Sequence, residues 1–264
     1  MISMGDITKY FHRGSINEIL ALEGVSLDVK KGDFITIIGS NGAGKSTLLN
    51  CLAGCFPPDS GSISVDEKDV TAWPEHKRAG FIGRVFQNPL LGTCASLTIE
   101  QNLALAARRG KAHGIGLGVK NRDREHFREE LQHVKLGLED RLKDKVGLLS
   151  GGQRQALTML MAVMVRPEVL LLDEHTAALD PKTANQILDL TEMIVSEQNL
   201  TTLMVTHNMQ QALRMGNRLV MMHRAKIILD VEGEEKRNLT VEDLIARFYT
   251  VRGEEFSQDR MLLV

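Results

Sequence analysis

Short apolar runs alternate with segments of helical periodicity along most of this chain. "FITIIG" (34–39) and "VLLLDE" (169–174) are apolar runs bounded by turn residues, and this pattern predicts two buried strands. "ALEGVSLDV" (21–29) alternates polar and apolar positions, which predicts a half-buried strand. Because buried strands that alternate with helices are typical of a mostly parallel sheet, the pattern predicts an α/β fold.

Caps and turn residues mark the ends of the predicted helices. Gly54 closes a helix that begins near Lys45, and Asp180 followed by Pro181 marks the start of another helix. The other elements expected by the same reasoning are strands over 80–87, 201–207, 218–223 and 226–231, and helices over 208–215 and 241–248.

The pattern becomes helical between residues 88 and 166. Thr98 and Gln101 have capping-box spacing, and Asn121 is placed to cap a helix with an apolar face. That face carries Phe127, Leu131 and Val134. The glycine-rich stretch "RRGKAHGIGLGVKNR" (108–122) follows no strand, so we interpret it as a solvated loop and not as a dinucleotide turn.

These elements predict a single domain over 1–248. We expect its core to comprise 1–87 and 167–230, with an N-terminal antiparallel β region and a helical subdomain inserted over 88–166. Residues 232–264 form a short C-terminal extension, in which Thr240 is placed to cap a helix that docks on the core.

Composition narrows the class of protein. Of the 264 residues, 43% are apolar and 25% are charged, which is ordinary for a globular chain, and the net charge of -2 argues against nucleic-acid binding through bulk charge. Three cysteines without a disulfide framework fit a reducing cytosol. The longest nearly apolar stretch, 156–165, is too short to span a bilayer, so we expect any membrane function to require a membrane protein partner.

The stretch "GSNGAGKST" (39–47) has the pattern of a phosphate-binding loop between a strand and a helix. Gly39, Gly42 and Gly44 let backbone amides approach a phosphate, and Lys45 and Ser46 supply a positive charge and a Mg²⁺ ligand. The remaining candidate phosphate contacts in this loop are Ser40, Asn41, Ala43 and Thr47.

Polar residues end three of the predicted strands. Asp173 at a strand's carboxyl end suits a Mg²⁺ ligand reached through water, and Glu174 is placed to polarise an attacking water molecule. His207 is a candidate for hydrogen bonding to a γ-phosphate or to that water, although a lone histidine is more often structural. Gln87 is a further candidate for contact with Mg²⁺ or water.

An ordered set of motifs resembles the ATP-binding-cassette (ABC) ATPases over residues 3 to 230. The set consists of "GSNGAGKST", "VFQNP", "LSGGQRQ", "VLLLDE", "AALD" and "VTHNM". The resemblance implies a P-loop NTPase fold, ATP and Mg²⁺ as cofactors, and Glu174 as the general base beside His207. It also implies that Ser46, Gln87 and Asp173 surround Mg²⁺.

In this family two ATPase chains pair head to tail and bury two ATP molecules between them. By resemblance, Ser150, Gly151, Gly152 and Gln153 contact the ATP of the partner chain, and Asp180 crosses the interface. Glycine amides at the start of a helix are physically suited to that role because they form an anion site. Phe11 resembles the aromatic residue that stacks on adenine, with Tyr10 as the alternative. His175 departs from the family pattern, in which proline is common at that position.

The resemblance also suggests what the hydrolysis energises. We expect an ATP-hydrolysing subunit of an importer for amino acids or similar small solutes, attached at the cytoplasmic face of the membrane. Its expected partners are a second copy or a homologous ATPase, integral permease subunits and, indirectly, a solute-binding protein, but no nucleic acid. Leu90 and Leu91 are candidate permease contacts. An exporter or lipid-handling ATPase is the alternative, and a soluble non-transport ATPase is a third possibility.

Overall fold

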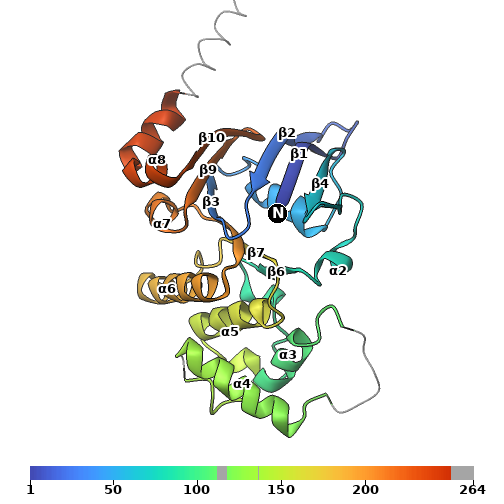
Figure 1. Ribbon diagram of the computed structural model, residues 1–264, viewed down its shortest axis with the longest axis vertical. Coiled ribbons are helices and arrows are strands. Elements are labelled where there is room, and N and C mark those ends of the chain that lie inside the picture. Colours follow the sequence, from blue (N-terminus) through green and yellow to red (C-terminus); the bar gives the residue numbers. More distant parts are fainter. Residues whose placement is uncertain (112–117, 136, 251–264) are drawn as a thin grey trace, which may run out of the picture.

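The computed structural model describes residues 1–111, 118–135 and 137–250, and these residues form two sheets flanked by helices (Figure 1). The larger sheet has the strand order β10-β9-β3-β8-β7-β6, and only β10 pairs antiparallel with its neighbour. Its strands are β3 (Phe34–Gly39), β6 (Ile82–Val85), β7 (Val169–Asp173), β8 (Thr201–Val205), β9 (Arg218–His223) and β10 (Lys226–Glu232). The predicted mostly parallel α/β core is therefore confirmed.

The smaller sheet is the antiparallel N-terminal region expected from the sequence, although the sequence did not predict each of its strands. Its order is β2-β1-β4-β5, and its strands are β1 (Ile2–Phe11), β2 (Ile19–Val29), β4 (Ser60–Val65) and β5 (Lys68–Asp69). Strand β4 begins at Ser60. The glycine- and serine-rich start of β4 is exposed and gives no strand signal, because only Ile63 and Val65 are buried.

The helices lie around and below the larger sheet. Among the described residues they are α1 (Lys45–Ala53), α2 (Glu75–Arg78), α3 (Ile99–Ala106), α4 (Asn121–Val134), α5 (Gly151–Val163), α6 (Pro181–Gln198), α7 (Met209–Arg214) and α8 (Gly233–Asn238). Residues 241–250 are also helical. In Figure 1, α3 and α4 form the lower end of the molecule, and α5 lies between them and the sheet.

Most predicted helix starts are confirmed by side-chain caps. The Thr98 and Gln101 side chains form the predicted capping box, and the Asp180 carboxylate accepts a hydrogen bond from the Thr183 N–H at 3.1 Å. The Thr240 hydroxyl likewise accepts from the Asp243 N–H. Asn121 is not a cap, because the helix already includes it and Lys120 precedes the first turn.

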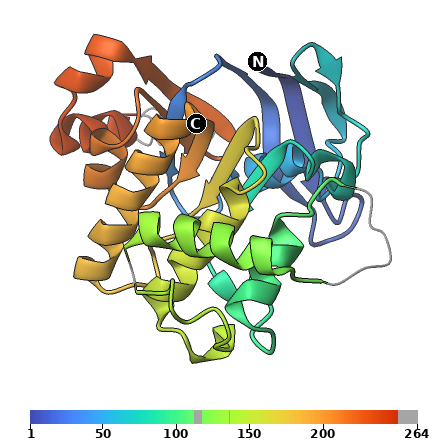
Figure 2. The ribbon, with the colours of Figure 1, turned by 60° about the horizontal axis from the view of Figure 1, so that its bottom comes forward.

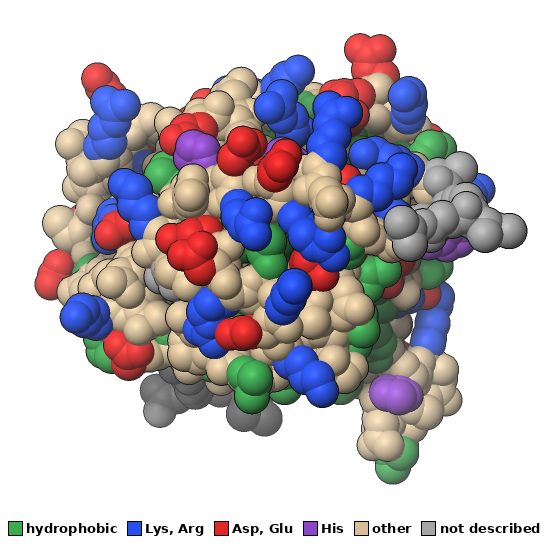
Figure 3. Space-filling model, turned by 90° about the horizontal axis from the view of Figure 1, so that it is seen from below, with side chains coloured by type: hydrophobic (Ala, Val, Ile, Leu, Met, Phe, Trp, Pro, Cys, Tyr) green, Lys and Arg blue, Asp and Glu red, His purple; other side chains and the backbone are tan. Residues whose placement is uncertain are grey.

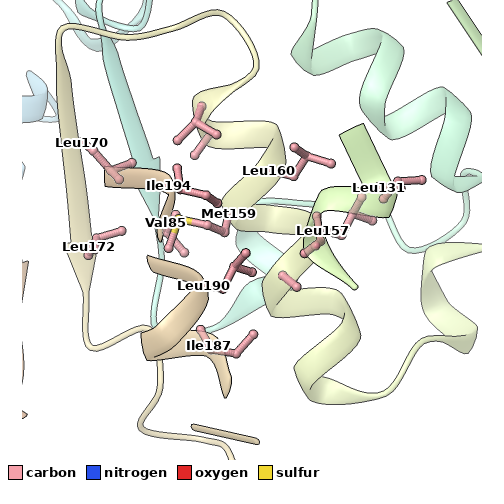
Figure 4. Close-up of a cluster of buried hydrophobic side chains, with 14 of the residues drawn as sticks. Val85, Leu131, Leu157, Met159, Leu160, Leu170, Leu172, Ile187, Leu190 and Ile194 are labelled. Atoms are coloured by element: carbon pink, nitrogen blue, oxygen red, sulfur yellow. The ribbon is translucent and has the colours of Figure 1, made fainter. Parts of the chain in front are cut away.

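Three clusters of buried side chains hold these layers together. One lies between the larger sheet and α3 to α6 (Figure 4), and it includes Phe127, Leu131 and Val134 of α4. A second joins the two sheets and α1, so the antiparallel sheet and α6 lie on opposite sides of the parallel strands (Figure 2). The third joins β9 and β10 to α7 and the C-terminal helix, which contributes Leu244. The predicted docking of this helix on the core is therefore seen in residues 241–250.

Arg78 links the C-terminal end of α1 to the chain around α2 through hydrogen bonds. Its side chain is fully buried, and Cys51 and Leu52, whose carbonyls it reaches, lie in the last turn of α1. The guanidinium donates to five backbone carbonyls, those of Cys51, Leu52, Val70, Thr71 and Trp73. Since α1 begins with the predicted phosphate-binding residues, Arg78 secures the helix that presents them.

The surface of the helical end mixes both signs of charge. In the view from below, acidic and basic side chains are interspersed (Figure 3). Over the described ranges, no helix combines the length and the apolar character that a membrane span requires. The loop expected over 108–122 falls partly outside the described residues, as do residues 251–264 of the expected C-terminal extension.

Candidate nucleotide-binding site

The phosphate-binding loop joins β3 to α1, as the sequence predicts. Gly39 has φ +150°, and a Cβ there would lie 2.1 Å from the Met222 carbonyl oxygen of the neighbouring strand. Gly44 has φ +99°, and a Cβ there would lie 2.4 Å from the Ala21 carbonyl oxygen. Both positions require glycine because the loop passes directly against backbone atoms. The N–H groups of the first turn of α1 are left free for an anion.

Lys45 lies in the centre of this loop and is 5% exposed. Its Nζ donates to the carbonyl oxygens of Gly39 at 2.8 Å and Ser40 at 3.0 Å. Burial lowers the pKa of Lys45, while the charges of Glu174 and Asp173 act in the opposite direction. A phosphate would supply the full negative charge that these carbonyls lack.

A pocket of about 390 Å³ opens over the loop. It is lined by Asn41 to Thr47, by Glu174 and His207, and on its outer side by Phe11, Ile19 and Ala21. Phe11 makes an edge-to-face contact with Phe56, with ring centroids 5.3 Å apart. Of the two predicted adenine contacts, Phe11 therefore lines the pocket and Tyr10 does not.

Ile19 was not identified from the sequence. It is the cross-strand partner of Phe11, so the antiparallel pairing of β1 and β2 brings it to the pocket. The strand predicted from alternation begins at Ala21, and the sequence gives no information about which residue lies opposite Phe11. The register therefore had to come from the structure.

The predicted Mg²⁺ ligands Ser46 and Asp173 are in contact. The Ser46 hydroxyl donates to Asp173 Oδ1 at 3.1 Å. A hydroxyl beside a single carboxylate fits Mg²⁺, which keeps several water molecules and takes further oxygen ligands from a nucleotide. No cluster of three or more His, Cys, Asp or Glu side chains suited to a metal occurs within the described ranges, so the protein residues alone form no complete cage.

Glu174 and His207 form a close pair beside the loop. His207 Nε2 lies 2.5 Å from Glu174 Oε2, and the Glu174 side chain is largely buried while that of His207 is half exposed. Glu174 has φ +47°, and its N–H donates to the Val205 carbonyl at 3.0 Å. The turn after β7 and the end of β8 thus bring together two residues that are 33 positions apart.

His175 is buried behind this pair. Its Nε2 lies 3.1 Å from Thr191 Oγ1, and that hydroxyl donates to the Ile187 carbonyl. The hydroxyl hydrogen is therefore used, so Nε2 is the donor of the contact. Burial lowers the pKa of His175 to about 4. His175 ties the turn after Glu174 to α6.

Gln87 lies apart from these residues. Strand β6 ends at Val85, so Gln87 is exposed, two positions beyond the strand, and does not line the pocket that contains Lys45. Its contact with Mg²⁺ or water stays a prediction.

The residues 150–153 form the start of α5. Ser150 caps the helix by accepting from the Gln153 N–H, and Gln153 Oε1 accepts in return from the Ser150 N–H. Gly151 is exposed, whereas Gly152 is buried against Thr183, which follows Asp180 at the start of α6. The hydrogen bonds from the Thr183 side chain and backbone lower the pKa of Asp180.

This helix start does not line the pocket of its own chain. None of the residues from Ser150 to Gln153 is among those around Lys45. The chain therefore presents two separate helix N-termini suited to anions, one at α1 and one at α5.

Comparison with known proteins agrees with this geometry. Residues 22–177 match the family model described as "ABC transporter". The chain is 47% identical to a "Tyrosine transport ATP-binding protein" of Clostridioides difficile, over 94% of this chain and 98% of that protein. It is 36% identical to "Methionine import ATP-binding protein MetN 1" of Bacillus thuringiensis subsp. konkukian, over 86% of this chain and 65% of that protein.

Solved structures show the same fold. A dimeric ATP-binding cassette, MJ0796, bound to ADP and Pi, superposes with a TM-score of 0.75 and 29% identity, over 88% of this chain and 98% of that chain. A nucleotide-free cassette from an ABC transporter also superposes with a TM-score of 0.75, at 28% identity, over 89% of this chain and 92% of that chain. On these grounds, the chain belongs to the ABC transporter family and is an ATPase whose loop at residues 39–47 lies in the P-loop NTPase fold.

Proposed function

We propose that this chain powers the uptake of amino acids by a membrane transporter, and that two copies act as a head-to-tail dimer closed by ATP. The observation that carries the proposal is the separation of the two helix N-termini. The start of α5 lies outside the pocket around Lys45, which leaves it available to complete the nucleotide site of another chain.

The proposed chemistry uses the residues gathered at the ends of β3, β7 and β8. Residues 39–47 bind the phosphates of ATP, and Ser46, Asp173 and Gln87 hold Mg²⁺. When bound, Mg²⁺ offsets the negative charge that develops on the transferred phosphoryl group. The Glu174 carboxylate accepts a proton from the attacking water, and it is held close to that position by the contact with His207.

His207 changes partner in this scheme. In the structure its Nε2 contacts Glu174 Oε2. A γ-phosphate oxygen near the same atom competes for this hydrogen bond, so ATP binding transfers the His207 contact from Glu174 to the phosphate and leaves the carboxylate free to accept the proton of the water. Loss of that phosphate after hydrolysis removes contacts from both chains and lets them separate.

The dimer contacts are proposed for Ser150 to Gln153 and Asp180. Gly151 exposes its N–H at the start of α5, and a Cβ there would make only an ordinary contact at 3.4 Å within its own chain. The absence of a side chain at Gly151 is therefore not required by folding. It is consistent with a surface that a nucleotide of the partner chain approaches.

A groove between the sheet and the helical part is the proposed permease contact. Its volume is about 410 Å³, and its apolar lining includes Phe86, Leu91, Leu105 and Met161. Leu91 is 70% exposed and Leu105 is 60% exposed, which leaves apolar surface for a partner to cover. Leu90, the other candidate contact, lies beside the groove and does not line it.

The substrate class rests on the named relatives. One is named for tyrosine transport and the other for methionine import, so we propose an amino acid as the solute. A solute-binding protein delivers it to the permease, and the ATPase stays attached to the permease at the cytoplasmic face. We also propose the division into a core of 1–87 and 167–230 and a helical subdomain of 88–166.

Reconstitution tests the proposal. The chain is purified with the membrane subunits that accompany it, and ATP-dependent uptake of radiolabelled tyrosine and methionine into proteoliposomes is measured. Uptake that is stimulated by a solute-binding protein is expected. Extrusion, or transport of lipid only, would favour the exporter alternative. Gln87→Ala is expected to keep ATP binding and to lose the coupling of hydrolysis to uptake, and normal uptake by this variant would contradict the role of Gln87.

A further inference from the structure

Arg84 lies between the nucleotide site and the groove proposed for the permease. It belongs to β6, and its side chain is 12% exposed. One end of the guanidinium reaches the nucleotide site, where Nη2 lies 3.6 Å from Asp173 Oδ2 and donates to Asn50 Oδ1 at 2.6 Å. The same side chain lines the groove together with Phe86, over whose ring the guanidinium lies at 4.5 Å.

The two oxygens of Asp173 therefore have different partners. Oδ1 accepts from the Ser46 hydroxyl, and Oδ2 faces Arg84. A guanidinium next to a carboxylate reduces the negative potential that the carboxylate offers to a metal ion on its other side. Arg84 thus competes with a divalent cation for the charge of Asp173. It also holds the carboxylate in one orientation, and these two effects change metal affinity in opposite directions.

We expect the competition to dominate. The Asp173 side chain is short, is already oriented by Ser46, and has few rotamers to lose. The charge of Arg84 acts on a divalent ion across a partly buried space, where screening by solvent is incomplete. Arg84 therefore lowers the affinity of this site for its metal.

Two of the three guanidinium nitrogens of Arg84 have no strong hydrogen-bond partner among the described residues. Its Nε is buried without a hydrogen-bond partner among the described residues, and its Nη1 contacts only the weak acceptor Cys55 Sγ at 3.1 Å. The charged residues of the groove lining are Arg84, Arg109 and Glu75, so the lining carries an excess of positive charge. A segment that enters this groove with a carboxylate would complement that excess.

We propose that Arg84 is a positioning residue through which the permease controls metal binding. A carboxylate of the permease segment draws the Arg84 guanidinium away from Asp173, and Asp173 is then free to bind the metal. This inference rests on the proposed function of the groove. Its first step, competition between Arg84 and the metal for Asp173, concerns the ATPase chain alone.

The first experiment measures metal-dependent nucleotide affinity on the isolated chain. The dissociation constant of ADP is determined by calorimetry with Mn²⁺ and again with EDTA, and the ratio of the two constants reports how strongly the metal contributes. Arg84→Met should make this contribution about 2- to 5-fold larger, the size expected for the loss of one ion pair near the protein surface. Arg84→Lys keeps the charge and should stay near the wild-type value.

A matched variant controls for the loss of an arginine elsewhere. Arg214 pairs with the exposed carboxylates of Asp189 and Glu192 on α6, and Arg214→Met should leave the ratio unchanged. An Arg84→Met ratio equal to or smaller than that of the wild type would overturn the proposal, because it would show that orientation outweighs charge. Circular dichroism and melting temperature confirm that each variant is folded.

The second experiment repeats the titration on the complex with the co-purified membrane subunits. The wild-type contribution of Mn²⁺ should rise on assembly towards the Arg84→Met value, and the Arg84→Met variant should show no further rise. An equal rise in both proteins would overturn the coupling step. Failure of the wild-type chain to assemble with any membrane subunit would instead contradict the proposed function, and the result on the isolated chain would still decide the competition.

Discussion

Replacement of Arg78 by methionine should destabilise the protein strongly. The methionine retains an apolar stem of similar length but removes all five hydrogen bonds to backbone carbonyls. The carbonyls of Cys51 and Val70 keep a second donor, from the N–H groups of Gly54 and Trp73. The carbonyls of Leu52, Thr71 and Trp73 accept no second backbone hydrogen bond within the described part of the chain.

The expected loss of stability follows from these three carbonyls. A buried acceptor that loses its partner costs about 1–3 kcal/mol, and the cost is smallest for the part-buried carbonyls of Thr71 and Trp73. The loss is partly offset by the desolvation penalty that the buried guanidinium no longer carries. We expect a net loss of about 3–5 kcal/mol, in the range measured when one partner of a buried charged contact is removed. For a chain of this size that corresponds to a fall in Tm of about 10 °C.

Thermal unfolding followed by circular dichroism, with and without ADP, measures this effect. Arg78→Lys retains three donors on a shorter group and should lie between the wild type and the methionine variant. Arg214→Met removes only exposed ion pairs and should change stability by less than about 1 kcal/mol. A fall in Tm for Arg78→Met no larger than that for Arg214→Met would refute the reasoning.

Three further predictions concern the nucleotide site, the start of α5 and pH. Lys45→Ala should weaken ATP binding at least about 10-fold and abolish ATP hydrolysis, because it removes the positive charge that faces the phosphates. Nucleotide titration measures the binding, and a phosphate-release assay measures the hydrolysis. Gly151→Ala should keep its Tm but lose ATP-driven dimerisation. Gly152→Ala should instead lower stability by about 1–3 kcal/mol, because its Cβ would lie 2.3 Å from Thr183 Cγ2; equal Tm values for the two variants would contradict this distinction. Burial lowers the pKa of Lys236 to about 8, below its value in the unfolded chain, so the unfolded state binds more protons than the folded state above pH 8. The free energy of unfolding should therefore rise between about pH 8 and about pH 10. Denaturant unfolding should show this rise in the wild type and not in Lys236→Met.

The sequence predicted those parts of the fold that local signals specify. Strand β3 and the cap at Asp180 follow from an apolar run and an Asp-Pro pair, which act within a few residues. Strand β1 was not predicted from the sequence because its alternation of polar and apolar residues is broken. Its pairing with β2 shifts register between Met4 and Ile7, where Asp6 has φ +51°.

In the site, too, the residues that belong to local motifs were predicted, and those placed only by tertiary contacts were not. The loop around Lys45 was recognisable from its spacing, and Asp173, Glu174 and His207 were placed by the rule that ligands lie at the carboxyl ends of parallel strands. Arg84 and Arg78 were missed because an arginine in a strand or short helix gives no local sign of burial. Their partners come from segments that only the folded chain brings together.

The central claim is that each ATP is held by two chains. Its most direct test is the mass of Glu174→Gln in solution, measured by size-exclusion chromatography with light scattering, with and without ATP. The variant retains the loop of residues 39–47 and the start of α5 but lacks the proposed base, so ATP should convert it from monomer to a stable dimer. The same variant with Gly151→Ala should remain monomeric. A monomer of Glu174→Gln at saturating ATP would contradict the claim.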